Sequence, residues 1–316
     1  MTRTVVVLVN YYGASDTNNC IQSLLGCSHR PQLVVVDNSP NDPELEAVVA
    51  TYPDAKLIRA PENLGFGRGN NLGIEWVLKN TDCEFVFIFN NDAMVEADAL
   101  QRLEQSMDEH PDVGISSPRI VMAEDPGVLC YGGGEVDWRR GGGVVPCVLG
   151  SSTAPLAMLS RPITFASGCA MLIRREVLEK IGGFDDRYFM YEEDLELGLR
   201  AQKAGYAIWY EPLALVRHVG QGSMRKGGEF VGLWSPANPR LPFYVYHVVR
   251  NRLLTMYIHA RGIQRVKFAI GFPVLILSKL IQFIRHRRWD GVRAVFQGWV
   301  AYRQLCHTGS QRAEAR

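Results

Sequence analysis

The sequence predicts an α/β fold, with a mixed, mostly parallel sheet flanked by helices and a helical C-terminal extension. Two apolar runs rich in β-branched residues, 4–12 (TVVVLVNYY) and 33–37 (LVVVD), are typical of strands buried on both faces. Between them, Asp16 to Leu25 has the apolar spacing of a helix, with Asp16 or Thr17 as its N-cap. Strand, helix and strand within so short a stretch form a βαβ unit, which requires parallel strands.

The same alternation continues to about residue 110 and then weakens. Further helices are expected at 43–51, from after Gly69 to Lys79, at 98–109, from near Arg175 to Gly182, and at 192–206. Further strands are expected at 56–60, 85–92, within 163–174, around AIWYEP and around LALVRH. The Gly- and Pro-rich stretch 116–164 is expected to cross the sheet and form a side ribbon, and the chain beyond Pro242 is expected to be helical.

Composition and charge exclude several classes of protein. The chain has 316 residues, 47% of them hydrophobic, which is too apolar for a disordered protein. A formal net charge of +1 argues against a dedicated nucleic-acid binder. The charge is uneven, because residues 261–316 carry a net +9 and the rest of the chain a net −8. A basic C-terminal end is what a protein needs if that end approaches an anionic membrane surface.

The seven cysteines are scattered and include no CxxC pair, so they indicate free thiols in a reducing cytoplasm. The N-terminal apolar run ends at Asn10, which is too short for the core of a signal peptide. We therefore expect a cytoplasmic protein.

Three polar clusters follow predicted strands: Asn10-Tyr11, Asp37-Asn38 and Asn90-Asn91-Asp92. Parallel sheets bind ligands beyond the carboxyl ends of their strands, so these clusters mark a candidate site. A dinucleotide dehydrogenase would bind there too, but the glycines of Gly65–Gly69 have the wrong spacing for its GxGxxG loop and do not follow the first strand.

Taken in order, several segments resemble glycosyltransferase family two, in particular rhamnosyltransferase-like members with the GT-A type of Rossmann-like fold. They are VVVLVNYYGASDTNNCIQSLL, VVVDNSPND, ENLGFGRGNNLGI, FIFNNDAMV, FASGCAMLIRREVLEKIGGFDDRYFMYEEDLELGLRAQKAGY and RHVGQGS. The resemblance covers about residues 4–255. It implies a catalytic domain at 1–240, with a nucleotide-binding half at about 1–115 and an acceptor-binding half at about 116–240, and a helical, basic and apolar extension at 241–316.

The resemblance implies a nucleotide-sugar site in the first half. Asp37 matches the family's base-binding Asp, and its carboxylate or the neighbouring amide of Asn38 can pair with N3–H of uracil or thymine. Asn10 and Tyr11 would flank the same base. The glycine loop and the polar motif after the fourth strand add the donor-side residues Asn63, Gly65, Arg68, Asn70 and Asn91. A turn cap at Asp37 and an ordinary glycine loop are the structural alternatives.

Asn90-Asn91-Asp92 stands where the family carries its DxD metal motif. The resemblance implies a divalent cation, Mg²⁺ or Mn²⁺, at Asp92, with His218 as a further ligand. Only Asp92 of the three is a carboxylate, so the motif departs from the family's pattern. A structural role is the alternative for His218, since a lone His is often structural.

Glu192-Glu193-Asp194 opens a predicted helix and matches the family's ED motif. The resemblance implies that Asp194 is the general base, beside Glu193, and that Gly168 lies on the acceptor side. Capping of the helix dipole is the structural alternative. The glycine-rich segment Gly220–Gly228, with Arg225 and Lys226, is expected to form a lid.

The segment Phe268–Ile284 is 17 residues of mainly apolar sequence between basic residues. This pattern favours a helix lying in a membrane interface over a transmembrane span or a helix packed on a partner subunit. It leaves a homo-oligomer open, and it places the protein at the inner face of the plasma membrane.

The leading interpretation is an inverting, metal-dependent transferase of L-rhamnose from dTDP-rhamnose to a saccharide or lipid-linked saccharide. The alternatives are a UDP-galactofuranose or UDP-hexose transferase, a catalytically silent nucleotide-sugar binding module, and, more remotely, a nucleotidyltransferase.

Overall fold

The computed structural model describes residues 2–146, 148–220, 225–226, 229–230, 232 and 234–314. The chain divides into two compact units. The first comprises Met1–Glu135, Val144–Phe189 and Glu193–Val219, and the second Val136–Gly143, Met190–Glu192 and Gly220–Arg316. The expected lid lies mostly outside the described residues, as do the side chains of Arg225 and Lys226.

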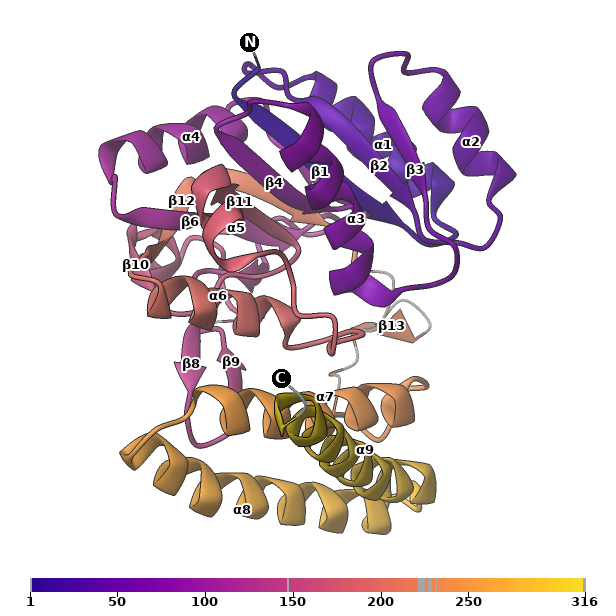
Figure 1. Ribbon diagram of the computed structural model, residues 1–316, viewed down its shortest axis with the longest axis vertical. Helices are drawn as coiled ribbons and strands as arrows, with labels where there is room; N and C mark the ends of the chain where they lie inside the picture. Colours follow the sequence, from indigo (N-terminus) through magenta and orange to yellow (C-terminus); the bar gives the residue numbers. More distant parts are fainter. Residues whose placement is uncertain are drawn as a thin grey trace. The chain divides into compact units, whose positions relative to one another are not determined.

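The first unit is built on a mixed sheet whose N-terminal part is parallel (Figure 1). Its strands are β1 (Thr4–Asn10), β2 (Gln32–Asp37), β3 (Lys56–Arg59) and β4 (Phe85–Asn90), in the order β4-β1-β2-β3. All three pairings are parallel, with Asn10 opposite Asp37 and Val9 opposite Asn90. The βαβ prediction from the apolar runs is therefore confirmed.

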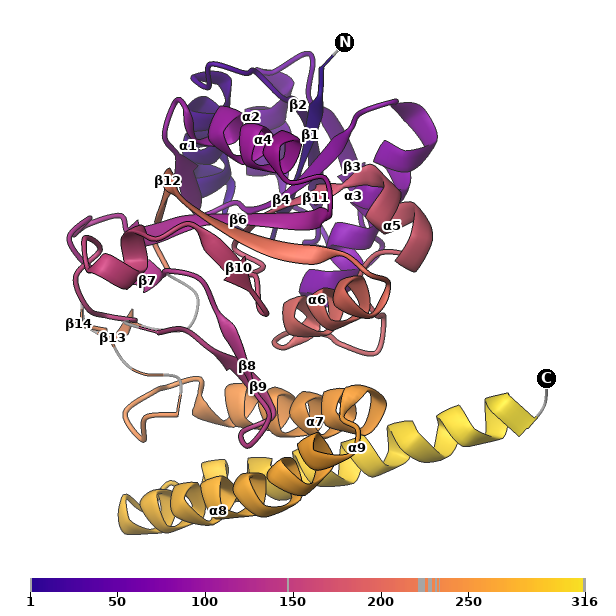
Figure 2. The same cartoon turned by 90° about the vertical axis from the view of Figure 1, so that its left-hand side faces the viewer.

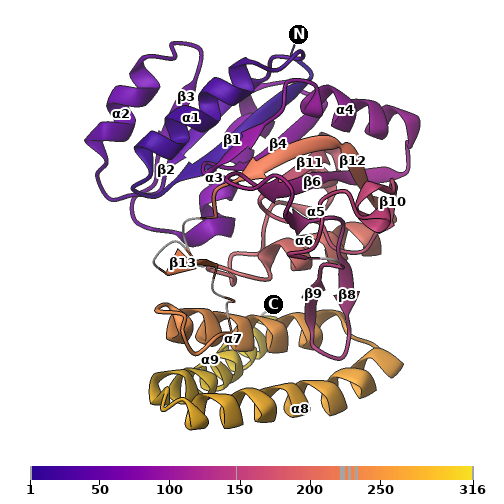
Figure 3. The same ribbon diagram turned by 180° about the vertical axis from the view of Figure 1, so that it is seen from behind.

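The helices between these strands lie on both faces of the sheet. Helices α1 (Ala14–Leu25) and α2 (Pro43–Ala50) lie on one face, and α3 (Gly65–Asn80) lies on the other (Figures 1 and 3). Right-handed crossovers require this arrangement, because β2 and β3 extend the sheet to one side of β1 and β4 extends it to the other. The winding therefore reverses between β1 and β4, where open α/β sheets bind ligands.

The second half of the sheet is reached through β11 (Ala170–Arg174), which is antiparallel to β4. The remaining strands of the unit are β5 (Ala93–Val95), β6 (Val113–Met122), β7 (Leu129–Tyr131), β10 (Arg161–Ile163) and β12 (Ala207–His218). The remaining helices are α4 (Ala99–Glu109), the 3₁₀ helix at Pro155–Met158, α5 (Arg175–Ile181) and α6 (Glu193–Lys203).

Strands β5, β6 and β7 were not predicted as separate strands, and the bounds of several predicted elements differ. The first helix begins at Ala14 with Gly13 as its N-cap, so Asp16 lies in its first turn instead of capping it. The helix expected after Gly69 begins at Gly65, so all of Gly65–Gly69 in the predicted glycine loop is helical. The two strands expected around 207–218 are one strand, β12, with a bulge between Glu211 and Leu215 that absorbs Pro212.

The glycines of α3 explain why a glycine-rich segment is helical here. A Cβ at Gly73 would lie 2.4 Å from a methyl carbon of Val7, so only glycine lets the helix lie this close to β1. Gly65 has φ +78°, and a Cβ there would lie 2.1 Å from the carbonyl oxygen of Phe189. The glycines therefore serve close backbone packing as well as any ligand.

The second unit contains three long helices: α7 (Leu241–His259), α8 (Ile263–Arg285) and α9 (Trp289–Glu314), shown in Figure 2. It also includes most of the ribbon formed by β8 (Glu135–Asp137) and β9 (Gly142–Val144), and the short pair β13 (Arg225–Lys226) and β14 (Glu229–Phe230). Its core is formed by the apolar residues Leu241, Val245, Val249, Phe272, Phe283, Ala294 and Val295.

The short segment Met190–Glu192 belongs to this second unit because α7 holds it. Asn251 Nδ2 donates hydrogen bonds to the carbonyl oxygens of Met190 (2.9 Å) and Tyr191 (2.6 Å). Arg252 donates to Glu192 Oε1 at 2.8 Å, and the two side chains are only 10% and 8% exposed. Tyr191 and Glu192 both have positive φ, at 69° and 68°. These contacts stabilise a backbone conformation that non-glycine residues rarely adopt.

Candidate active site

The predicted site residues all belong to the first unit, and six of the fourteen lie at or directly after the carboxyl ends of β1, β2 and β4. The ends of β1 and β4 are adjacent in the sheet, since Val9 pairs with Asn90. This is the point where the winding of the sheet reverses.

Asp92 and His218 lie together although 126 residues separate them. Strand β5 begins directly after Asp92 and is antiparallel to β12, which places His218 opposite Ala93. The Val219 N–H also donates to the Asp92 carbonyl oxygen at 3.0 Å. As a result, His218 Nε2 lies 3.1 Å from Asp92 Oδ1, and the two side chains are 20% and 18% exposed. The pair is held rigidly and still reaches solvent.

The surroundings of His218 shift the pKa of its imidazole. Burial would lower the pKa of His218, but the interactions of the ring with Cys169 and with the Asp92 carboxylate outweigh it and raise the pKa well above its ordinary value. Burial, together with the charge of Asp92, raises the pKa of Asp16 in the first turn of α1. A second carboxylate therefore lies within electrostatic reach of Asp92, although the sequence suggested only a capping role for Asp16.

The two asparagines before Asp92 point in different directions. Asn90 Nδ2 lies 3.5 Å from His218 Nε2. Asn91 Nδ2 instead donates to Thr17 Oγ1 at 3.0 Å, in the first turn of α1. Asn90 ends β4, and Asn91 and Asp92 follow it in a turn, so the Asn90 amide faces β12 while the Asn91 amide faces α1. Asn90 belongs to the polar cluster expected after the fourth strand, but its position beside His218 was not predicted.

These donors fit a divalent cation only if the substrate completes the coordination. Within the described part of the chain, no group of three or more His, Cys, Asp or Glu side chains is arranged to hold a metal ion. Asp92 Oδ1 and His218 Nε2 form a donor set with few protein ligands. Mg²⁺ and similar hard cations are commonly held in this way, by one or two carboxylates together with substrate phosphates. The residues present therefore fit such an ion beside a diphosphate.

Asn10 is fully buried, and its amide orders the turn between β1 and α1. Its Nδ2 donates to Asp42 Oδ2 at 3.0 Å, and its Oδ1 accepts from the Gly13 N–H (3.1 Å) and Thr17 Oγ1 (3.0 Å). Asn10 thus stabilises the backbone around the site but is itself not exposed to solvent.

Tyr11 and Tyr12, by contrast, are 53% and 59% exposed, and their rings meet edge to face with centroids 4.9 Å apart. Tyr12 has φ +51° and its N–H donates to Ser39 Oγ at 2.9 Å. Two exposed aromatic rings at the end of a strand offer a surface on which a flat base can stack. Tyr12 is therefore a further candidate residue, which the sequence patterns did not predict.

Asp37 and Asn38 hold the neighbouring turns. Asp37 is 2% exposed, and its Oδ1 accepts from the Ser39 N–H at 3.0 Å, which is the turn-capping arrangement. Asn38 Oδ1 accepts from the Leu64 N–H at 2.9 Å, and its Nδ2 donates to the Gly65 carbonyl oxygen at 3.1 Å. Asn38 therefore ties the end of β2 to the start of α3.

The start of α3 carries the remaining donor-side residues. Asn63 Oδ1 accepts from the Gly65 N–H at 3.0 Å, and Arg68 is exposed. Asn70 is 1% exposed; its Nδ2 donates to the Phe66 carbonyl oxygen at 2.9 Å, while its Oδ1 has no hydrogen-bond partner among the described residues. Only Arg68 of this group projects a charge into solvent.

Asp194 is connected to the Asp92 region through Gly168 and Cys169, the two residues directly before β11. Its Oδ2 accepts from the Gly168 N–H at 2.9 Å. The next residue, Cys169, accepts from the Asn90 N–H at 2.9 Å and interacts with His218. A Cβ at Gly168 would lie 3.1 Å from the Phe66 ring and 3.4 Å from the Asp194 Cβ. Gly168 thus lies between the start of α3 and the carboxylate of Asp194.

The neighbouring carboxylates of α6 are used differently. Glu193 is 5% exposed, and Glu196 is 1% exposed and bound to Arg200 at 2.8 Å. Arg200 also donates to the carbonyl oxygens of Ile181 and Gly183, so Glu196 anchors the helix. The Asp194 carboxylate, by contrast, lies at the start of the helix and faces Gly168.

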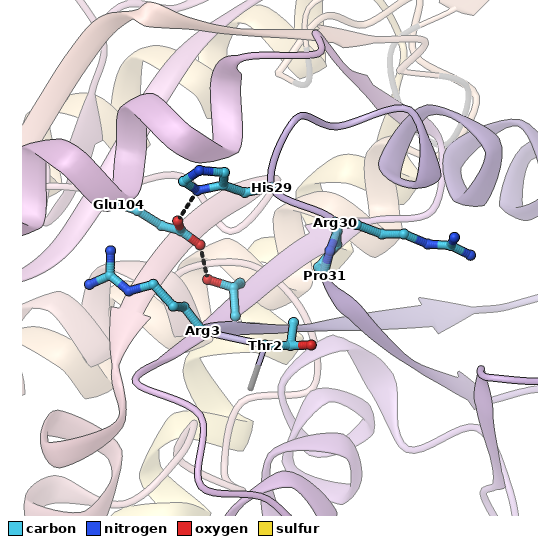
Figure 4. Close-up of a pocket in the computed structure, with 7 residues that line it drawn as sticks. Thr2, Arg3, His29, Arg30, Pro31 and Glu104 are labelled. Carbon is cyan, nitrogen blue, oxygen red and sulfur yellow. Dashed lines mark hydrogen bonds and ion pairs between the residues drawn. The ribbon is translucent and has the colours of Figure 1, made fainter.

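A separate cavity of about 430 Å³ lies at the opposite edge of the sheet (Figure 4). It is lined by residues at the amino ends of β1 and β2, and by Glu104 of α4, which binds His29 and Thr4. Since the seven residues of β1 separate this edge from Asn10, the cavity lies about 20 Å from the candidate site. It has no part in the arrangement described above.

Comparison with known proteins places this geometry in a family. The model of a family described as glycosyltransferase like family 2 matches residues 2–227. An N-acetylglucosaminyl-diphospho-decaprenol L-rhamnosyltransferase of Mycobacterium tuberculosis is 30% identical over 237 residues, which cover 67% of this chain and 75% of the relative. The low-salt glycan biosynthesis hexosyltransferase Agl10 of Haloferax volcanii is 29% identical over 203 residues, covering 64% of this chain and 62% of the relative.

Solved structures share the fold at low sequence identity. GalNAc-T7 in complex with UDP, GalNAc and Mn²⁺ superposes with a TM-score of 0.55 at 16% identity, covering 78% of this chain and 48% of that chain. The mannosyltransferase PcManGT of Pyrobaculum calidifontis, in complex with GDP-Man and Mn²⁺, gives 0.54 at 15% identity, covering 98% and 80%. The GT-A type of fold expected from the sequence is therefore confirmed.

Proposed function

Because this chain belongs to glycosyltransferase family 2 and is a glycosyltransferase, we propose that it transfers one sugar from a nucleotide diphosphate donor with inversion, using a divalent cation. The observation that carries the proposal is the continuous connection from Asp194 through Gly168 and Cys169 to Asn90, beside the Asp92–His218 pair. The Asp194 carboxylate and the Asp92–His218 pair, which would hold the cation, are thus both connected to the end of β4.

The donor we propose is dTDP-L-rhamnose, Mg²⁺ or Mn²⁺ being the cation. The M. tuberculosis relative is named as an L-rhamnosyltransferase, which supports this sugar. Tyr11 and Asp37, at the ends of adjacent strands, would receive the thymine ring, with Tyr12 extending the stacking surface. Arg68 at the start of α3 would meet the diphosphate, because a guanidinium pairs well with phosphate oxygens.

The reaction would need one group that removes a proton and one that accepts the charge of the leaving group. Asp194 would take the proton of the acceptor hydroxyl, and the Gly168 N–H would hold the carboxylate in place for this step. Asp92 and His218, with Asn90 beside them, would hold the cation. When bound, a divalent cation neutralises the developing charge of a departing diphosphate. A single displacement at the anomeric carbon inverts its configuration.

We propose that the acceptor is a saccharide carried on a lipid diphosphate. The name of the M. tuberculosis relative includes such a lipid carrier, and the basic C-terminal helices of this chain fit the surface where such acceptors reside. The protein would then work peripherally at the inner face of the plasma membrane, in the synthesis of a cell-surface polysaccharide. A homo-oligomer is compatible with this arrangement.

A UDP-hexose transferase is the second candidate, and the name of the H. volcanii relative favours it. A silent nucleotide-sugar binding module is the third, because only one residue of the Asn90-Asn91-Asp92 motif is a carboxylate. These candidates differ in which donor binds and in whether any sugar is transferred.

The test combines donor binding and turnover on one set of variants. Wild-type protein is screened for thermal stabilisation by dTDP-rhamnose, UDP-galactofuranose and UDP-hexoses, with and without Mn²⁺, and transfer to a polyprenyl-diphosphate-linked saccharide is followed by mass spectrometry. Asp194→Asn should bind the donor as wild type does and lose at least about 10³-fold in turnover. Asp54→Asn, on an exposed loop of the same unit, is the control and should keep full activity. Donor binding without any transfer by the wild-type protein would identify a binding module.

A further inference from the structure

Helix α8 of the second unit has two apolar faces, and only one of them is covered. Its inner face contributes Phe272 and Phe283 to the core of the unit, with Phe268, Leu275, Ile276 and Leu280 packed against them. The opposite face carries a stripe of seven apolar side chains, each between 47% and 66% exposed: Ile263, Val266, Ile270, Val274, Leu277, Ile281 and Ile284. Steps of three and four residues place these side chains in one row along the whole helix.

By length and hydropathy alone, α8 could cross a bilayer. It is the one helix of the described chain that is long and apolar enough to do so, and its 23 residues span about 34 Å. Its packing within the unit decides against that orientation. A Cβ at Gly271, near the middle of the helix, would lie 2.7 Å from the carbonyl oxygen of Arg139. The turn of the β8–β9 ribbon therefore rests against the centre of α8.

That turn is polar. Its Asp137 carboxylate accepts from the backbone N–H groups of Arg139 and Arg140. On the inner face of α8, burial and the nearby charge of Arg140 lower the pKa of Lys279. If α8 crossed a bilayer, the β8–β9 ribbon and the side chains of Arg140 and Lys279 would be carried into the hydrocarbon region. Irregular backbone and charges are strongly disfavoured there. A helix lying along the surface keeps them on the side away from the lipid.

The basic charge around the stripe favours an anionic lipid surface over a second copy of the chain as its partner. Residues 261–293 carry eight Lys or Arg and one acidic residue, Asp290. Pairing the stripe with the same stripe of a second copy would bring two such basic segments together. An anionic lipid surface complements them, and Lys267 and Arg285 lie near the two ends of the stripe, where their long side chains reach headgroups. The exposed Trp289 that follows α8 is the kind of side chain found at bilayer interfaces.

We propose that the seven-residue stripe of α8 lies in the plane of an anionic bilayer, inserted into one leaflet only. This inference rests on the membrane association proposed above and specifies its surface and orientation. It gives the second unit a function of its own, which is to hold the protein where a lipid-linked acceptor is found.

The experiment is flotation of the full-length protein with vesicles. Wild type should float with vesicles of phosphatidylcholine and phosphatidylglycerol, bind pure phosphatidylcholine at least tenfold less, and be released by a carbonate wash. Val274→Glu with Leu277→Glu should reduce flotation at least tenfold. Leu213→Glu, at an exposed leucine of the first unit, should float as wild type does. Transfer to a water-soluble acceptor should be equal in all three proteins, which separates failure of docking from failure of the catalytic proposal.

Two outcomes would overturn the inference. Wild-type protein that resists the carbonate wash while the double variant does not would indicate a spanning helix. A wild-type dimer in light scattering that the double variant abolishes, without flotation of either protein, would assign the stripe to a second copy of the chain.

Discussion

The Asp194 carboxylate accepts a 2.9 Å hydrogen bond from the backbone N–H of Gly168, 26 residues earlier in the chain. The contact aligns the proposed base with the end of β4, because Cys169 is in turn hydrogen-bonded to the Asn90 N–H. It also leaves little space at Gly168, since the Phe66 ring lies 3.1 Å from the position of a Cβ. The orientation of the carboxylate therefore depends on the absence of a side chain at residue 168.

Gly168→Ala should displace Phe66 and the Asp194 carboxylate by a few tenths of an ångström without unfolding the protein. Small misplacements of reacting groups are costly in catalysis, so we expect kcat to fall by at least about tenfold. Donor affinity should stay within about twofold of wild type, since the contact concerns the base. Steady-state kinetics and donor titration check this, and a variant that loses donor binding in proportion to kcat would contradict the assigned geometry.

Removal of the cation should abolish turnover, because the cation would neutralise the charge that develops on the departing diphosphate. Treatment with EDTA should stop transfer, and Mn²⁺ or Mg²⁺ should restore it. His218→Ala should raise the Mn²⁺ concentration for half-maximal activity at least about tenfold. His286→Ala, at an exposed position after α8, is the control and should leave the Mn²⁺ requirement unchanged. Full activity of wild type in EDTA would rule out the proposed cation.

Gly65→Ala should destabilise the protein more than an ordinary glycine substitution. The residue has φ +78°, and the new Cβ would lie 2.1 Å from the Phe189 carbonyl oxygen. Gly182→Ala is a matched control, because Gly182 has φ +76° but nothing lies within 4 Å of its Cβ position. Urea unfolding should give a loss of about 1 kcal/mol for Gly182→Ala and more than about 3 kcal/mol for Gly65→Ala. Equal losses would show that the close approach of Phe189 relaxes without cost.

Acid should destabilise the protein through His247 of α7. Burial, with the charge of Arg250, lowers the pKa of His247 to about 4, whereas an unfolded chain protonates His near pH 6.5. Between these values unfolding takes up a proton, so the stabilisation present above pH 6.5 is lost as the pH falls toward 4. His247→Gln should have a smaller loss of melting temperature between pH 7 and pH 4.5 than wild type. Identical pH profiles of the two proteins would contradict the assignment.

Local patterns in the sequence were sufficient for the α/β class, the parallel βαβ start and the helical C-terminus. Period-two and period-3.6 apolar spacing reflects burial of each element, which is why the elements were predicted within a few residues. The ten-residue strand β6 of the main sheet was not predicted, and two further exceptions arose where long-range packing overrides local preference. Gly65–Gly69 is helical, and its glycines allow close packing against Phe189, Phe184 and Val9. Strand β12 continues through Pro212 because a bulge absorbs the proline.

The sequence by itself also determined which residues are candidates, since polar side chains that follow buried strands must gather at one edge of a parallel sheet. Only the tertiary structure decided which of them meet. His218 reaches Asp92 through the pairing of β5 with β12, Asn90 and not Asn91 faces that pair, and Asp194 is oriented by Gly168. Such contacts depend on strand order and side-chain direction between segments 26 to 128 residues apart. Apolar spacing, which reports only on neighbours along the chain, carries no information about them.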